Sequence, residues 1–423
     1  MALLLATVLA GCVSLPDDRP TRPSPPSRPQ PGEAPAPRPA PVPAPAPTPA
    51  PTPAPTPTPT QPPAQAPAPP PRPAPVAVNA AEVRALALLA LPPQVAARSG
   101  WADDIATSFA ALSIPAQPGK LCALAAVIEQ ESNWQADPAV PGLARIAWAE
   151  LDKKRAHYGI PKPVMMLALA KPSRTGRSYR ERIDSLRTER ELSELYEDMI
   201  DEIPLGKRLL GGGNPVRTGG ATQVSLAFVA QQMAERDYPW RPAGTPRQEV
   251  FKRRGGIYFG AAMLLDYPVS YNRMLYRFAD YNAGRYSSRN AAFQAVLSQL
   301  TRQPIVLDGD LLRYGKGEPL PVRDAPSQAW RALATLHIGL PLAQIERDLR
   351  LEKRFEFEQS PTYLRVVALA QQRGVAMEHE RLPELQLHSP KITRPLTTAW
   401  FAQRCEARYR DCLARVNSAS GDD

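Results

Sequence analysis

The sequence predicts an all-α folded region that follows a long segment unable to form a core. Three observations support this prediction. Nearly all periodic apolar segments after residue 79 repeat at the spacing of a helix. Strand signals are scarce, and the best of them is the short run at residues 304–307. Before residue 79 proline dominates, because 28 of the 52 prolines lie between Pro16 and Pro75.

The chain begins with an apolar stretch, residues 2–11, which is too short to span a bilayer. Cys12 follows it in the order Leu9-Ala10-Gly11-Cys12. This order resembles a bacterial lipoprotein signal, which implies that residues 1–11 are a signal peptide and that Cys12 becomes the lipidated first residue. Val13 after the cysteine then implies a lipid-anchored protein of the Gram-negative outer membrane, facing the periplasm.

Residues 12–78 are predicted to form a Pro/Ala/Thr-rich disordered tether. Repeated proline favours an extended left-handed helix, so the 60 residues from 16 to 75 could reach on the order of 190 Å. The tether would let an attached domain reach the cell wall, although an indifferent linker would have the same composition.

The region from residue 79 onward is long enough for a large core, and its apolar periodicity is helical. The predicted helices span residues 80–91, 101–112, 121–132, 145–158, 189–200, 222–236, 247–266, 269–279, 291–301, 327–338, 341–351, 361–372 and 395–416.

The folded region is basic. The formal net charge is +10, and five arginines against three acids make the stretch from 16 to 75 only +2. In an exported protein this charge favours anionic polymers such as peptidoglycan, or lipid headgroups, and we expect no nucleic-acid partner.

Three cysteines follow Cys12 in the chain. Cys405 and Cys412 lie seven residues apart, which is about 10.5 Å along a continuous helix, whereas a disulfide needs Cα atoms within about 7 Å. Either that helix breaks or Cys122 is a partner. No cysteine lies at metal-ligand spacing from a histidine, so we expect no metal or cofactor.

One glutamate stands out as a candidate general acid. Residues 121–128 are apolar on every face of a helix, and polarity begins at Glu129. At about 100° per residue Glu131 points along the same side as Val127 and Ile128, whereas Glu129 points the opposite way. Burial against this apolar stripe would raise the pKa of Glu131 towards neutrality and suit it to donate a proton. The alternative is a glutamate that only ends a helix.

Two later segments add to this pattern. Residues 219–225 read as a tight turn into a helix and contain Gln223, and residues 278–284 read as a helix ended by a glycine and contain Tyr281 and Asn282. Together with Glu131-Ser132 they resemble, in order, the motifs of the lysozyme-like lytic transglycosylases: I-x-x-Q/E-E-S-x-F, G-L-M-Q, N-I-x-x-G-x-x-Y-L and A-Y-N-A-G. The third motif would correspond to Ile257, Gly260 and Leu264.

The resemblance implies a function and a site. Glu131 would be the single catalytic acid and base, and Ser132, Gln223, Tyr281 and Asn282 would bind the glycan. The substrate would be a peptidoglycan glycan strand, cut between N-acetylmuramic acid and N-acetylglucosamine without cofactor or metal.

The resemblance also implies an organisation. Residues 79–301 would be a lysozyme-like catalytic domain, with an insertion at about 145–212 because 91 residues separate Glu131 from Gln223. Residues 302–423 would form a helical C-terminal region packed on it.

Two alternatives remain open. Ala221-Thr222 stand where the family shows Leu-Met, so the protein could be a non-catalytic peptidoglycan-binding, structural or uptake lipoprotein that retains the groove. Asp280 could be a second carboxylate near the groove, or a charge that ends a helix. As a whole, the chain also resembles an uncharacterised family of bacterial outer-membrane lipoproteins.

Overall fold

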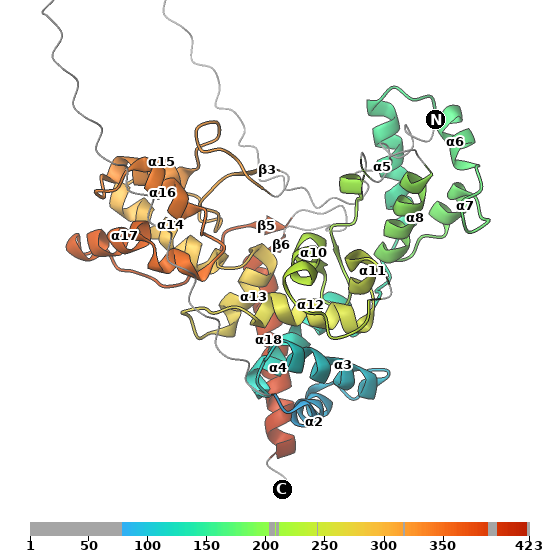
Figure 1. The fold of residues 1–423 in the computed structure, drawn as a ribbon, viewed down its shortest axis with the longest axis horizontal. Helices are drawn as coiled ribbons and strands as arrows, with labels where there is room; N and C mark the ends of the chain where they lie inside the picture. Colours follow the sequence, from blue (N-terminus) through green and yellow to red (C-terminus); the bar gives the residue numbers. More distant parts are fainter. Residues whose placement is uncertain are drawn as a thin grey trace, which may run out of the picture. The chain divides into compact units, whose positions relative to one another are not determined.

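The computed structural model describes residues 78–202, 208, 211–242, 244–315, 318–387 and 396–420. These residues are mostly helical, which confirms the predicted all-α class (Figure 1). Their strands are two residues long and pair into three two-stranded hairpins. The predicted signal peptide, Cys12 and residues 12–77 of the predicted tether lie outside the described residues. No helix in the described ranges is long and apolar enough to cross a membrane.

In the described residues, three helices begin the first hydrophobic core: α2 (Ala80–Ala90), α3 (Arg98–Ala111) and α4 (Pro118–Ser132). Asn79 caps α2 by accepting hydrogen bonds from two backbone amides, and Pro118 begins α4, where its missing N–H is not needed. Leu121 to Ile128 are buried on all sides, as the unbroken apolar run predicts. The helix ends at Asn133, which has a left-handed φ of 48°.

In the described residues up to 202, the segment predicted as an insertion carries the helices α5 (Leu143–His157), α6 (Lys162–Leu169), α7 (Tyr179–Asp184) and α8 (Glu189–Asp201). Sequence periodicity predicted α5 and α8 but not α6. Capping boxes at Ser178 and Thr188 begin α7 and α8, because each hydroxyl accepts from the third residue of its helix. Buried leucine, isoleucine and tyrosine side chains of these helices join the first core.

A hairpin precedes the next helices. After the 3-10 turn η1 (Gly211–Gly213), β1 (Thr218–Gly219) pairs with β2 (Val224–Ser225), and α10 (Leu226–Glu235) follows. The prediction that this helix starts at residue 222 is therefore wrong. Gly220 and Gln223 have left-handed backbone conformations, with φ of 75° and 51°, so the chain turns where a helix was expected.

The predicted helix at 247–266 is two helices, α11 (Pro246–Val250) and α12 (Arg253–Leu265). The break follows from the fully buried carboxylate of Glu249. It accepts hydrogen bonds from Lys252 and Arg254 at the start of α12 and from Tyr238 in the chain after α10. Turning the chain at residues 251–252 lets these donors surround the carboxylate, because a buried charge needs several partners.

A second hydrophobic core follows α13 (Met274–Ala283). It is formed by α14 (Ser287–Thr301), α15 (Gln328–Leu336), α16 (Leu342–Leu349), η2 (Phe355–Gln359) and α17 (Pro361–Gln372), with the hairpin of β3 (Tyr314–Gly315) and β4 (Glu318–Pro319). The strand predicted at 304–307 is absent. Val306 instead donates its amide to the side chain of Gln328, and Leu307 accepts from Glu384.

The last helix returns to the first core. A hairpin of β5 (Gln386–Leu387) and β6 (Leu396–Thr397) precedes α18 (Thr398–Ser420), which packs along α4 and α13 (Figure 1). Cys412 on this helix forms a disulfide with Cys122 on α4, and Cys405 is free and buried. The helix therefore stays continuous and Cys122 is the partner, which was one of the two predicted arrangements. The two hydrophobic cores do not follow the boundary predicted at residue 301. Helix α14, which ends there, packs in the second core, and α18 near the end of the chain packs in the first.

Candidate functional site

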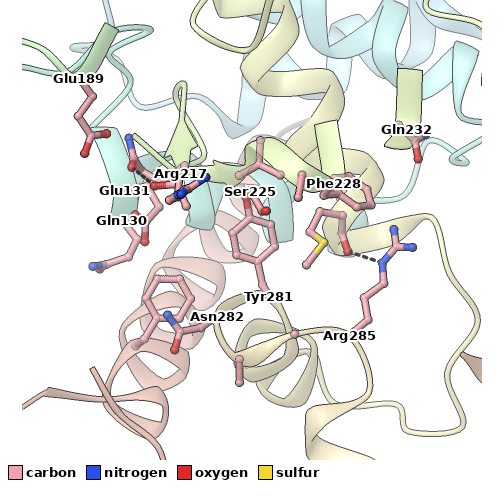
Figure 2. A pocket seen from close by; sticks show the side chains of 18 of the residues that line it. Gln130, Glu131, Glu189, Arg217, Ser225, Phe228, Gln232, Tyr281, Asn282 and Arg285 are labelled. Carbon is pink, nitrogen blue, oxygen red and sulfur yellow. Dashed lines mark hydrogen bonds between the residues drawn. The ribbon is translucent and has the colours of Figure 1, made fainter. Parts of the chain in front are cut away.

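A cavity of about 1640 Å³ lies where several segments meet. Its walls come from the end of α4, the chain before α5, the β1–β2 hairpin, α10, the end of α13, the segment after α16 and the start of α18. Glu131, Gln223, Tyr281 and Asn282 all line it, although they are far apart in sequence. Figure 2 shows the side chains of Glu131 and Tyr281 projecting into the same space from different helices.

The two glutamates at the end of α4 diverge as helical spacing predicts. Glu131 lines the cavity and is partly buried. Glu129 does not line it, and its carboxylate lies 3.6 Å from the Nε of Arg408 on α18. Of these two glutamates, Glu131 alone lines the cavity.

The other two residues of this motif face inward. Ser132 is buried, and its hydroxyl donates a 2.9 Å hydrogen bond to the carbonyl of Ile128 one turn earlier, so it does not line the cavity. Trp134, in the aromatic position, packs edge-on against Trp101 with ring centroids 5.3 Å apart. Both residues support the end of α4 from within the core.

Gln223 is held by the hairpin that carries it. Its side-chain Oε1 accepts a 3.0 Å hydrogen bond from the hydroxyl of Thr218, and its amide donates to the carbonyl of Gly220. Thr222 next to it donates from its hydroxyl to the carbonyl of Gly256 on α12 at 2.7 Å. The hairpin is thus tied directly to the backbone of a buried helix.

This close approach depends on glycine. A Cβ at Gly260 would lie 2.5 Å from the side chain of Thr222, and one at Gly256 would lie 2.8 Å from the backbone nitrogen of Ala221. Because real Cβ atoms do not approach so closely, these positions must lack a side chain for the hairpin to rest on α12. The glycine in the third motif therefore positions the second motif.

Tyr281 links α13 to the hairpin. Its hydroxyl donates a 2.7 Å hydrogen bond to the carbonyl of Thr222. Burial raises the pKa of this hydroxyl; the hydrogen bond to Thr222 opposes the rise, and the negative charge of Glu131 adds to it. Tyr281 is therefore a neutral hydroxyl in the electrostatic field of Glu131.

Asn282 is tied to the last helix, because its Oδ1 accepts a 2.8 Å hydrogen bond from the hydroxyl of Thr398. Cys405, one α18 residue that sequence reasoning did not connect with the site, also lies in the field of Glu131. Burial raises the pKa of the Cys405 thiol, and the carboxylate of Glu131 adds to this rise. The chain's last helix therefore forms part of the environment of the acid.

Arg285 is a second residue that the sequence reasoning missed. It follows the glycine of the last motif, lines the cavity, and donates to the carbonyls of Ala262 and Met263 at 2.6 and 3.3 Å (Figure 2). Its guanidinium lies 4.9 Å from the ring centroid of Phe228, and burial lowers its pKa. The sequence offered one signal for Arg285, which is its position directly after Gly284 at the end of the last motif.

Asp280 is not a second carboxylate of the cavity. It is fully buried and does not line the cavity, and it accepts hydrogen bonds from the amides of Ser288 and Tyr286 and from the hydroxyl of Tyr271. Burial raises its pKa to about 7, against the lowering effect of the hydrogen bonds. The carboxylate caps the start of α14, so the helix-end interpretation is the correct one.

The charged residues that line the cavity are mostly cationic. Six basic side chains face three acidic ones; the basic ones are Arg145, Arg217, Arg285, Arg350, Lys353 and Arg354, and the acidic ones are Glu131, Glu189 and Glu235. In the described ranges, no three or more histidine, cysteine or acidic side chains are grouped to hold a metal ion. The cavity therefore suits an anionic ligand.

The chain is similar to proteins of unknown function. A family described as "Protein of unknown function (DUF1615)" matches residues 94–415, a range that includes α5–α8, the second core and most of the first core. The "Uncharacterized protein YaiW" of Escherichia coli (strain K12) is 46% identical over 336 residues, which cover 79% of this chain and 90% of that protein. No solved structure matches the chain.

Proposed function

The chain belongs to the DUF1615 family of proteins of unknown function, and from its cavity we propose that it cleaves peptidoglycan as a lytic transglycosylase, with Glu131 as the single acid and base. The observation that carries the proposal is the convergence of Glu131, Gln223, Tyr281 and Asn282 on one cavity. These are residues of three motifs that resemble those of lysozyme-like enzymes, and the glycine of a fourth supports the hairpin. A lysozyme-like core is part of the proposal.

The size and charge of the cavity support a polymer as substrate. Small-molecule sites usually measure about 300–1,000 Å³, whereas this cavity has about 1640 Å³. Its surplus of cationic side chains suits peptidoglycan, whose peptide stems carry carboxylates.

The reaction needs one carboxyl group. Glu131 in its acid form donates a proton to the oxygen that bridges N-acetylmuramic acid and N-acetylglucosamine, and the bond from the anomeric carbon to that oxygen breaks. The carboxylate then takes the proton of the muramic C6 hydroxyl, whose oxygen bonds to the anomeric carbon and closes a 1,6-anhydro ring. Glycosidases that use water usually need a second carboxylate. The neutral hydroxyl of Tyr281 adds no negative charge of its own beside Glu131.

The proposal includes a location. A lipid on Cys12 would anchor the protein to the outer membrane, facing the periplasm, and the proline-rich residues that follow would let the domain reach the glycan strands.

A second candidate function is a non-catalytic peptidoglycan-binding, structural or uptake lipoprotein. The hydrogen bonds of the cavity residues favour it, because Tyr281 donates to Thr222 and Asn282 accepts from Thr398. Polar groups that already bond within the protein must exchange partners before they can bind a sugar.

Digestion of purified sacculi by the full chain distinguishes the two candidates. The released muropeptides are separated and weighed, because a 1,6-anhydro product is lighter by one water than a hydrolysed product. Release of anhydro products supports the lyase, and release of hydrolysed products would indicate a lysozyme reaction. Binding to sacculi with no product from any preparation would favour the second candidate.

A further inference from the structure

A wall of three cations lies between α16 and η2, outside the sequence range of the transglycosylase-like motifs. Arg350, Lys353 and Arg354 all line the cavity, and all three are exposed. Arg350 pairs with Glu346 at 2.8 Å and the Nζ of Lys353 lies 3.6 Å from Asp310, so two of the cations are partly neutralised. We refer to Arg350, Lys353 and Arg354 as the cationic wall.

Buried charged groups hold the backbone of this wall. Arg289 on α14 is 1% exposed and donates to the carbonyls of Glu352 and Arg354. The carboxylate of Glu352, also 1% exposed, accepts from the amides of Leu311 and Leu312 and from the hydroxyl of Tyr314. Because buried charges are costly unless each is bonded, these contacts fix one position for the segment. The backbone that carries the cationic wall is therefore preorganised.

The cationic wall lies beside the motif residues. A Cβ on Gly284 would lie 3.7 Å from the Nζ of Lys353, and Gly284 follows the Tyr281-Asn282 pair by two residues. Lys353 also lies over the ring of Tyr314, 4.3 Å from its centroid. A glycan bound along Glu131 and Asn282 would thus present its substituents close to these cations.

We propose that the cationic wall binds the carboxylates of the peptide stems, so that the protein selects glycan strands that carry stems. This inference rests on the proposed function in taking peptidoglycan as the ligand. Each muramic acid carries its stem on a side group of the sugar, and the stem has free carboxylates at some distance from the glycan. Arginine binds carboxylates through two parallel N–H donors, and lysine adds a point charge. Cations at the cavity wall suit such a group better than they suit the uncharged sugar hydroxyls.

The test measures binding, with the full chain carrying Glu131→Gln so that no substrate is consumed. The ligands are glycan chains of one length in three forms: with intact stems, with stem carboxylates converted to amides, and with stems removed. We expect the intact form to bind about tenfold more tightly than the other two, which is the size expected for a few partly exposed charge-assisted hydrogen bonds.

The same binding measurement on variants of the cationic wall is the second part of the test. Replacing Arg350, Lys353 and Arg354 by glutamine should make the three ligands bind alike. The matched control is Arg331→Gln with Arg365→Gln, because both arginines are exposed on the second core and neither lines the cavity. The control should keep the preference for intact stems. If the triple variant does not fold, Arg354→Gln alone should still reduce the preference.

The outcomes of these experiments distinguish failure of the stem-binding inference from failure of the lyase proposal. Equal affinity of the parent protein for all three ligands would overturn the inference, and so would a triple variant that folds and still prefers intact stems. If wild-type protein releases nothing from sacculi while the preference for stems is found, the lyase proposal fails and the stem subsite stands. If product is released but the preference is absent, only the stem subsite fails.

Discussion

The hydroxyl of Tyr281 donates a 2.7 Å hydrogen bond to the backbone carbonyl of Thr222. This bond joins the end of α13 to the β1–β2 hairpin, so Asn282 and Gln223 are held on the same cavity. Glu131 lies close enough to influence the pKa of that hydroxyl. A single hydrogen bond thus connects two of the motif segments beside the proposed acid.

Replacing Tyr281 by phenylalanine should lower the free energy of unfolding by about 1–2 kcal/mol, because the carbonyl of Thr222 loses its donor in a buried place. Urea unfolding measures the change. Tyr158→Phe is the control, since this tyrosine is exposed and its change should be within about 0.5 kcal/mol. Equal stability of both variants would show that the Tyr281 bond contributes nothing in solution.

Glu131→Gln keeps the shape of the side chain and removes its acidic proton. Release of 1,6-anhydro muropeptides should fall by at least about 10²-fold, while binding to sacculi and the melting temperature stay nearly unchanged. Glu129→Gln is the matched control, because this glutamate faces Arg408 rather than the cavity. An active Glu131 variant together with an inactive Glu129 variant would contradict the assignment of the acid.

Gly260→Ala should destabilise the protein by about 1–3 kcal/mol, because the new Cβ would lie 2.5 Å from the side chain of Thr222. In an unobstructed helix the same change would stabilise by about 1 kcal/mol. Gly212→Ala is the control, since nothing lies within 4 Å of a Cβ there. Thermal unfolding of both variants checks the prediction, and a Gly260 variant as stable as wild type would mean that the hairpin does not rest on α12.

The buried Asp280 should make stability depend on pH. Its pKa is about 7 in the folded protein against an ordinary value of 3.8, so between these values the folded state binds more protons than the unfolded state. The contribution of this group is therefore fully present below about pH 4 and is lost as the pH rises to 7. Urea unfolding at pH 4 to 8 measures the free energy of unfolding, which should fall less with rising pH in Asp280→Asn than in wild type. The slope is compared because the variant is expected to be less stable at every pH. The exposed Asp411→Asn should keep the wild-type slope.

Breaking the disulfide between Cys122 and Cys412 should cost roughly 2–5 kcal/mol, because it closes a loop of 290 residues. The double variant Cys122→Ala with Cys412→Ala should melt earlier than wild type and should no longer respond to a reductant. Cys405→Ala, which leaves the disulfide intact, should keep the response. A double variant that still responds to reductant would show that another pair of cysteines is oxidised.

The sequence by itself determined those features that depend on nearby residues. The helix at residues 361–372 was predicted with the bounds that α17 has, because proline at its start and apolar spacing along it are local signals. The opposite directions of Glu129 and Glu131 followed from helix geometry alone. The basic charge of the folded region also needed only the composition.

Only the tertiary structure decided features that depend on contacts between distant segments. The carboxylate of Glu249 is buried among donors from the start of α12 and from Tyr238, where the predicted helix at 247–266 breaks, and the carboxylate of Asp280 caps α14 instead of lining the cavity. The choice of Cys122 as the disulfide partner required the packing of α18 on α4. The cationic wall follows the same principle, since Arg289 reaches carbonyls more than 60 residues away in the chain. Such contacts leave no periodic signal, because their energy depends on burial and on partners that only the folded chain brings together.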